Sequence, residues 1–427
     1  MKRITVLALV LALAASSAFG AAQKDAGKGA GSASTSGDLV FAGWSGEEEG
    51  SRDIFNWMRS SWEQANPGKK ITWLGWPWEQ TATQLIIRNQ GNEKLDIAQD
   101  DIGIFATMAA SGLLADWNDL VGAAYLKENF EEASLAVGNV NGKQLGLPWV
   151  IAGGGMIYNP EILARAGFNE PPKTIAEFER CLEAVSKLPG DIIPYGVSTK
   201  DSTAANDFMP WIWTFGGHIY DANGNVTVNN AQGVAALTWY KGLMDKKYIR
   251  TNMSRFDSRQ LFAQGRVAFY DDAVLAKGIA LGNGVPADKL PQLVRPMLRP
   301  VLKAGDKPQS MMWGHMLVVF NNSNAKDSAV SFAKHLVGKE VAMRYFNQNG
   351  MPPVLKSVLS SPEVQNDPWV GNWVKITATG TLGEFDRSPQ KAQLTTILAE
   401  ELQACLTGDK TPQKAADDFA ARIKSVK

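Results

Sequence analysis

The sequence lacks an excess of either charge, and it contains little cysteine and little histidine. Its 427 residues include 43 basic and 43 acidic side chains, which leaves no net charge. Nucleic acids and anionic membranes attract proteins with an excess of basic residues, so bulk charge gives no reason to expect such a partner. With three His and two Cys, metal ligation is not indicated either. We therefore expect no metal, no cofactor and no nucleic-acid partner.

Motifs of several enzyme classes are also missing. The sequence contains no GxSxG nucleophile turn, no HExxH metal pair and no GxxxxGK[ST] phosphate loop. We expect a protein that is not an enzyme. The alternative is a secreted glycoside hydrolase, because paired carboxylates and tryptophans also line the sites of those enzymes. Carboxylates are plentiful, and the sequence does not tell how far apart they lie, so this alternative stays open here.

A marked apolar run occurs at the N-terminus. Lys2 and Arg3 precede the apolar stretch Ile4–Leu13, and small residues then lead to a cleavage site before Ala21. The stretch is shorter than the ~20 residues that span a bilayer. We expect residues 1–20 to be a signal peptide that exports the protein to the periplasm or another extracytoplasmic space.

A segment rich in Gly, Ser and Ala follows, and we expect residues 21–37 to form a flexible tether. Such a tether often follows a lipidated cysteine. The first cysteine here is Cys181, so a lipoprotein is not expected. Cys181 and Cys405 each fall within a helical pattern. A disulfide between them and two separate buried thiols both remain open.

From Asp38 onward, strand-like and helix-like segments alternate. Leu39–Ala42, Ile71–Trp76 and Leu95–Ala98 favour strands, and the segments between them favour helices. This alternation predicts an α/β fold with a mainly parallel sheet and helices on both of its faces. Such sheets bind ligands outside the carboxyl ends of their strands. The first residues after each strand are therefore candidates for the site.

Tryptophan gathers where the second of these strands ends, in the stretch ITWLGWPWEQ. We expect Trp73 in the core and Pro77 at the end of the strand. In a strand that continued this far, Trp76 and Trp78 would project from the same face. Trp78, with Glu79 beside it, thus predicts an apolar platform next to a hydrogen-bond acceptor.

These residue types suit a carbohydrate. A sugar ring has an apolar face of C–H groups and a rim of hydroxyls, which flat aromatics and fixed carboxylates or amides can bind. Burying ~100 Å² of apolar surface against one indole contributes on the order of 2.5 kcal/mol. The candidate stacking residues are Trp44, Trp78, Trp149, Trp211, Trp213 and Trp313. The candidate polar partners are Glu47, Glu79, Asp100, Asp101, Asp272 and His315.

Structural roles compete with several of these assignments. Asp272 is also suited to capping the next helix, and His315 is equally consistent with a hydrogen-bonded structural histidine. Trp211 and Trp213 are both consistent with core positions. Because residues two apart on a helix point to different sides, one of these two indoles is favoured to reach the site.

The order of motifs over residues 38–427 resembles the extracellular solute-binding proteins of ABC importers, in the branch that includes maltose-binding protein. No single motif is decisive, and the resemblance rests on their succession along almost the whole chain. In chain order the motifs are Ser111–Asp116, Leu147–Trp149, Met156–Pro160, Ala166–Phe168, Phe215–Gly217, Phe262–Phe269 and Gly350–Pro353.

The resemblance implies two α/β lobes joined by crossing segments, with a carbohydrate held in the cleft between them. It also implies that the protein delivers this solute to the transmembrane subunits of an ABC permease, and we expect it to be a monomer. The expected lobe I comprises residues 38–148 with 272–318, and the expected lobe II comprises residues 149–271 with 319–427.

The resemblance transfers incompletely at individual positions. Asp100 matches an acidic sugar ligand of the maltose-binding relatives, whereas Asp101 stands where they carry a basic residue. Ala152 falls where they have a carboxylate, and Met209 falls roughly where they have a stacking aromatic. These differences argue against maltose itself and imply a different carbohydrate.

Overall fold

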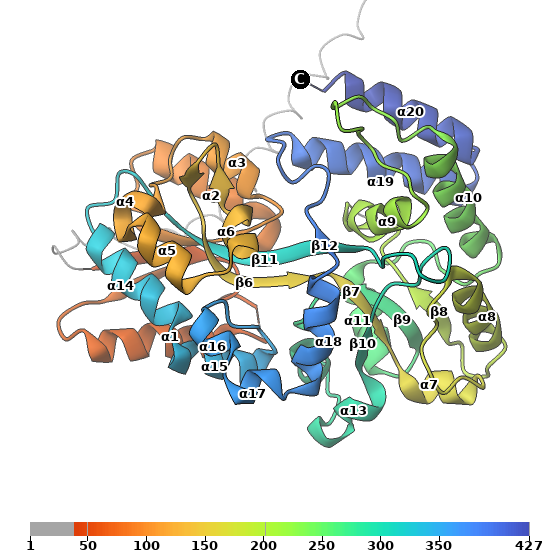
Figure 1. Cartoon of the computed structure of the whole chain (residues 1–427), viewed down its shortest axis with the longest axis horizontal. Coiled ribbons are helices and arrows are strands. Elements are labelled where there is room, and N and C mark those ends of the chain that lie inside the picture. Colours follow the sequence, from red (N-terminus) through yellow and green to blue (C-terminus); the bar gives the residue numbers. More distant parts are fainter. Residues whose placement is uncertain (1–37, 49, 201, 427) are drawn as a thin grey trace, which may run out of the picture.

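The protein consists of two lobes side by side, joined by strands that run between them (Figure 1). The computed structural model describes residues 38–48, 50–200 and 202–426. The expected signal peptide and tether, which fall before residue 38, lie outside the described residues. Each lobe is a β-sheet with helices packed against it, so the two-lobed α/β fold expected from the sequence is confirmed.

The sheet of lobe I has the strand order β12-β11-β3-β1-β2, and β6 also pairs with β11. β1 runs parallel to β2 and to β3, whereas β11 runs antiparallel to β3. The carboxyl ends of β1, β2 and β3 therefore lie at one edge of this sheet. The strands are β1 (Leu39–Gly43), β2 (Ile71–Gly75), β3 (Ile97–Asp101), β6 (Leu147–Gly153), β11 (Ser310–Val319) and β12 (Gly380–Thr381); a separate hairpin pairs β4 (Asn139–Val140) with β5 (Lys143–Gln144).

The sheet of lobe II has the strand order β10-β7-β9-β8. β8 and β9 run parallel, and β7 runs antiparallel to β9, so the carboxyl ends of β8 and β9 share an edge. The strands are β7 (Gly155–Tyr158), β8 (Ile193–Gly196), β9 (Val267–Asp272) and β10 (Arg295–Met297).

Helices surround both sheets (Figure 1). Within the described residues, none of them is long and apolar enough to cross a membrane. Those of lobe I are α1 (Arg52–Ala65), α2 (Trp78–Gln90), α3 (Phe105–Ala110), α4 (Trp117–Val121), α5 (Ala123–Asn129), α6 (Glu132–Val137), α14 (Lys326–Val337), α15 (Lys339–Asn349), α16 (Lys356–Leu359) and α17 (Pro362–Gln365). Those of lobe II are α7 (Pro160–Arg165), α8 (Ile175–Ser186), α9 (Thr203–Thr214), α10 (Ala231–Asp245), α11 (Arg255–Ala263), α12 (Ala276–Gly282), η1 (Ala287–Lys289), α13 (Leu290–Leu293), α19 (Lys391–Thr407) and α20 (Pro412–Lys424).

Three segments connect the lobes. β6 continues into β7 through Gly154, whose N–H donates to the Met311 carbonyl at 2.6 Å. β11 then brings the chain back to lobe I, pairing with β6 over Met312–Leu317. The third connection runs through α18 (Pro368–Thr377) and β12 to α19, and α18 packs against both β6 and β10.

The chain changes lobes later than the sequence suggested. After β9 it stays in lobe II, because β10 pairs with β7 and Val301 bridges to Thr174. After β11 it stays in lobe I, where α14 packs against α1 and α4, and it returns to lobe II with α19. The structure therefore corrects the lobe boundaries expected at residues 272 and 319. β11 carries the chain from lobe II into lobe I. The boundary expected at residue 319 had the chain pass from lobe I into lobe II instead.

Cys181 and Cys405 lie in α8 and α19 of lobe II. Both are buried free thiols, so they do not form a disulfide. Burial raises the pKa of Cys181 to about 12 and that of Cys405 to about 11, which keeps both thiols protonated. The structure thus decides between the two alternatives that the sequence left open.

Aromatic rings fill the core of lobe I. Phe41 is fully buried on β1. Its ring centroid lies 5.0 Å from that of Trp73 and 5.1 Å from that of Phe332, both in edge-to-face geometry, and 6.3 Å from that of Phe55. Trp73 itself packs at the edge of this core. Phe41 thus joins α1, α14 and β2 to the central strand.

Replacing Phe41 with alanine should destabilise the protein by about 3–5 kcal/mol, because a ring is lost from a core that cannot fully collapse around the cavity. Urea unfolding followed by circular dichroism measures this loss. Val374→Ala is the matched control, since Val374 is exposed on α18 and should change stability by less than about 0.5 kcal/mol. Equal stabilities of the two variants would contradict this description of the core.

Candidate functional site

An aromatic cluster lies where β1 ends and β11 begins. The imidazole of His315 contacts two indoles, with its ring centroid 4.9 Å from that of Trp44 and 4.7 Å from that of Trp313. Gln99 donates to Nδ1 of His315 at 3.1 Å and to the Ser45 hydroxyl at 2.9 Å. Burial lowers the pKa of His315 to about 3, so the imidazole is neutral and accepts this bond.

The residues of this cluster differ in their exposure. Trp44 and His315 are buried, whereas Trp313 is half-buried. Trp149 lies behind His315 and packs against Phe55 in the core of lobe I. In this structure Trp149 is thus a core residue, and Trp44 packs beneath the surface against His315. Of these three predicted stacking residues, only Trp313 is partly exposed to solvent.

Glu47 follows β1 and binds the strand next to it. Its Oε1 accepts a hydrogen bond from the Trp73 indole N–H at 2.7 Å. This contact depends on Gly75, because a Cβ at that position would lie 2.1 Å from Oε1 of Glu47. The predicted ligand residue Glu47 therefore already has a partner within lobe I.

Trp78 is the first residue of α2 and is 41% exposed. β2 ends at Gly75, and Pro77 lies at the N-cap of α2, as its ring favours. The two neighbouring indoles therefore diverge. Trp76 lies beneath the Arg88 guanidinium, which is 5.2 Å from the ring centroid, while Trp78 lies near Asp101. Glu79 also lies in α2, but its side chain is outside the described part of the chain.

The two adjacent aspartates at the end of β3 have different surroundings. Burial raises the pKa of Asp101 to about 6, and the nearby charge of Lys391 acts against that rise. Asp100 is completely buried inside lobe I. Its Oδ1 accepts the Asp101 backbone N–H, its Oδ2 has no hydrogen-bond partner, and burial with the neighbouring Asp101 charge raises its pKa strongly. Asp100 is therefore enclosed within lobe I, which argues against its predicted role as a ligand, whereas Asp101 lies near Lys391.

Lobe II reaches lobe I at this point. A Cβ at Gly103 would lie 2.7 Å from Oδ1 of Asp101 and 2.7 Å from Nζ of Lys391, so both charged groups meet at this glycine. Lys391, the first residue of α19, forms an ion pair with Asp386. The Thr107 hydroxyl also reaches the Pro389 carbonyl, at 3.4 Å. The sequence analysis missed Lys391 and Asp386, because no pattern in that segment marks them.

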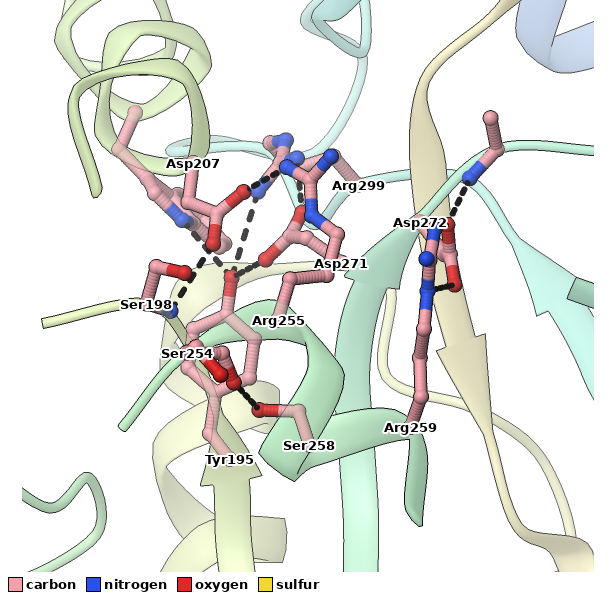
Figure 2. Close-up of polar contacts among 12 residues, drawn as sticks. Tyr195, Ser198, Asp207, Ser254, Arg255, Ser258, Arg259, Asp271, Asp272 and Arg299 are labelled. Atoms are coloured by element: carbon pink, nitrogen blue, oxygen red, sulfur yellow. Dashed lines mark hydrogen bonds and ion pairs between the residues drawn. The ribbon is translucent and has the colours of Figure 1, made fainter. Parts of the chain in front are cut away.

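The facing edge of lobe II carries three aspartate–arginine pairs at the ends of β8 and β9 (Figure 2). They are Asp207 with Arg255, Asp271 with Arg299, and Asp272 with Arg259.

Asp272 accepts from Nε of Arg259 at 2.9 Å and from its terminal nitrogen at 2.7 Å. It also accepts the N–H of Ala273 at 2.9 Å, so its carboxylate is held on both sides. The predicted ligand residue Asp272 thus acts here by fixing Arg259 at the edge of the lobe.

The two tryptophans of α9 lie inside lobe II. Trp211 is fully buried between the Phe178 ring and the Arg299 guanidinium, which lies 4.6 Å from its ring centroid. The Trp213 indole N–H donates to Glu384 at 2.7 Å, and Trp213 is also buried. In this structure both are core residues of lobe II, because their faces and N–H groups are already occupied.

A cavity of about 1290 Å³ lies beside the Asp101–Lys391 contact. Lobe I lines it with Phe105, Phe130 and Gln144, and the segment before α19 lines it with Asp386 and Arg387. None of the predicted stacking residues lines this cavity. Trp78, Asp101 and Trp313 therefore lie outside this cavity. The described part of the chain holds no group of three or more His, Cys, Asp or Glu arranged to bind a metal ion.

Comparison with known proteins finds a match to the family model described as "Bacterial extracellular solute-binding protein", over residues 57–372. An arabinooligosaccharide-binding protein of Bacillus subtilis is 27% identical over 86% of this chain and 83% of its own length. A probable ABC transporter-binding protein of Deinococcus radiodurans is 26% identical over 74% of this chain and 76% of its own. Among solved structures, the acarbose-binding GacH receptor of Streptomyces glaucescens has a TM-score of 0.81 at 21% identity, covering 92% of this chain and all of that one.

The change Asp101→Asn should alter the pH dependence of stability. The pKa of Asp101 is raised in the folded state, so the folded protein holds this proton more tightly than the unfolded chain does, and wild-type stability falls as pH rises from about 4 to 6. Asparagine does not ionise. Relative to wild type, the melting temperature of the variant should therefore rise by about 2–5 °C between pH 4 and pH 7.

Differential scanning calorimetry at both pH values measures this shift. The control is Asp119→Asn, at an exposed position on α4. A difference between D101N and wild type that stays constant from pH 4 to pH 7 would show that Asp101 ionises as an ordinary surface carboxylate.

Proposed function

This chain belongs to the family of bacterial extracellular solute-binding proteins, and we propose that its solute is a carbohydrate, a sugar or short oligosaccharide. We further propose that the protein acts outside the cytoplasm as a monomer and delivers its solute to the transmembrane subunits of an ABC permease. The solute binds between the lobes, where the carboxyl ends of β1–β3 face those of β8 and β9.

The exposed indole of Trp78 is the observation that carries the proposal. It lies at the start of α2, at the edge of lobe I and near Asp101. A flat ring near a carboxylate suits a sugar, which presents C–H groups on one face and hydroxyls on its rim. The half-buried Trp313 adds a second aromatic surface on β11. Two such stacks and a few hydrogen bonds can reach micromolar affinity, about −8 kcal/mol.

Similar proteins support a carbohydrate. The Bacillus subtilis relative is named for arabinooligosaccharide, and the Streptomyces receptor is described with bound acarbose. Glycoside hydrolysis receives less support from the site. The carboxylates of Asp207, Asp271 and Asp272 are each held by an arginine, so they are not placed as a pair of free acids around a scissile bond.

Lobe closure around the solute follows from this architecture. Asp101 of lobe I and Lys391 of the Lys391–Asp386 pair both lie at Gly103, so the two lobes approach each other beside the proposed site. A solute that touches both edges favours the closed arrangement, because it makes contacts there that the open arrangement lacks. Closure is how we expect occupancy to be signalled to the permease.

A panel of mono- and oligosaccharides, polyols and amino acids tests this function. With the mature protein, we expect a carbohydrate to raise the melting temperature, because a ligand that binds only the folded state stabilises it. Trp78→Ala should weaken the affinity for that carbohydrate by about 10- to 100-fold in calorimetric titration, and Trp78→Phe should weaken it less.

Ile87→Ala is the matched control, since Ile87 is exposed on the same helix at its far end. It should leave the affinity unchanged. A response to amino acids alone would refute the carbohydrate proposal, and turnover of an oligosaccharide would favour the hydrolase.

A further inference from the structure

An exposed aromatic ring lies on lobe II at a position that the sequence analysis did not select. Phe256 is 75% exposed, more than any other large hydrophobic residue that the structure describes as exposed. It lies in the first turn of α11. A single exposed hydrophobic side chain is ordinary on a protein surface, so its importance depends on what surrounds it.

The start of α11 lies at the edge of lobe II that carries the aspartate–arginine pairs. Thr199, just beyond β8, accepts the N–H of Met253 at its hydroxyl, 3.0 Å away, and donates its own N–H to the Met253 carbonyl at 2.8 Å. A capping box between Ser254 and Asp257 then fixes the first turn. Phe256 is therefore presented from a rigid helix start beside the carboxyl end of β8.

An arginine packs beside the ring. Arg255 and Arg259 are held by Asp207 and Asp272, respectively, as Figure 2 shows. The guanidinium carbon of Arg259 lies 5.4 Å from the centroid of the Phe256 ring. The Asp272 carboxylate holds Nε and one terminal nitrogen of Arg259, so the other terminal nitrogen is the one left to donate to a solute.

α11 packs against α12, which in turn packs against α15 of lobe I. Desolvation raises the pKa of the Glu48 carboxyl in the loop after β1, and the Arg259 charge acts against that rise. Phe256 lies one turn before Arg259 on the same helix, and residues three apart lie on the same side.

The charges at this edge indicate a neutral solute. Three aspartates balance three arginines in the pairs described above, so an added anion or cation would leave an uncompensated charge. A neutral ring with an apolar face and hydroxyl groups matches a phenyl ring beside a hydrogen-bond donor.

From these contacts we propose that Phe256, with Arg259 packed beside it, is the lobe II contact for the apolar face of a neutral, hydroxyl-rich solute. The inference rests on the proposed function, since it names a further residue of the same interlobe site. Trp78 on lobe I and Phe256 on lobe II then provide one aromatic surface from each lobe.

Calorimetric titration of wild type, F256A, F256L and F256W with arabinotriose, maltotriose and galacturonate tests the contact. For the neutral sugar that wild type binds, F256A should weaken binding about tenfold or more, and F256L should resemble F256A, because a branched side chain offers no flat face. F256W should bind at least as tightly as wild type. All three variants should keep the wild-type melting temperature, because the side chain is exposed.

Leu302→Ala is the control, since Leu302 is an exposed apolar residue of the same lobe, next to the bridge between Val301 and Thr174. A neutral sugar that binds wild type and F256A equally would overturn the contact and leave the proposed function standing. A preference for galacturonate would overturn the neutral-solute part. A third outcome is that no sugar binds and that an amino acid or polyol binds wild type more tightly than F256A. That result would overturn the carbohydrate function while supporting the contact.

Discussion

The two-lobed arrangement depends on the antiparallel pairing of β6 with β11. β11 pairs with β3 of lobe I along one side and with β6 along the other, and β6 continues directly into β7 of lobe II. The hydrogen bonds between β6 and β11 therefore anchor in lobe I the strand that continues into lobe II. Motion of one lobe against the other must be absorbed at the ends of this pairing, such as at Gly154.

This pairing also positions the aromatic cluster of the site. The register of β11 shifts between His315 and Met316, at the point where His315 meets the indoles of Trp44 and Trp313. Such irregularities redirect side chains at functional edges of sheets. The cluster is thus built on the segment that joins the lobes.

The protein has no net charge, yet its lobe II edge is densely charged. Buried ion pairs contribute little net stability, because removing two charges from water offsets much of their attraction. Their effect here is orientation. Asp272 holds Arg259 through two hydrogen bonds, and a donor fixed in advance loses less entropy when a solute arrives. Asp272, which the sequence analysis selected as a sugar ligand, therefore acts in this structure through the arginine that it holds.

Local sequence patterns determined the alternation of strands and helices and the end of β2 before Pro77. They also selected Trp78, Asp101 and Trp313 as candidates. Each of these features depends only on residues that are close in the sequence. Tertiary structure alone decided which candidates are exposed. Adjacent residues of a strand face opposite sides, so the strand pattern could not choose between Asp100 and Asp101. Nor could it bring Lys391 to Gly103 or select Phe256, because those placements depend on how distant segments pack together.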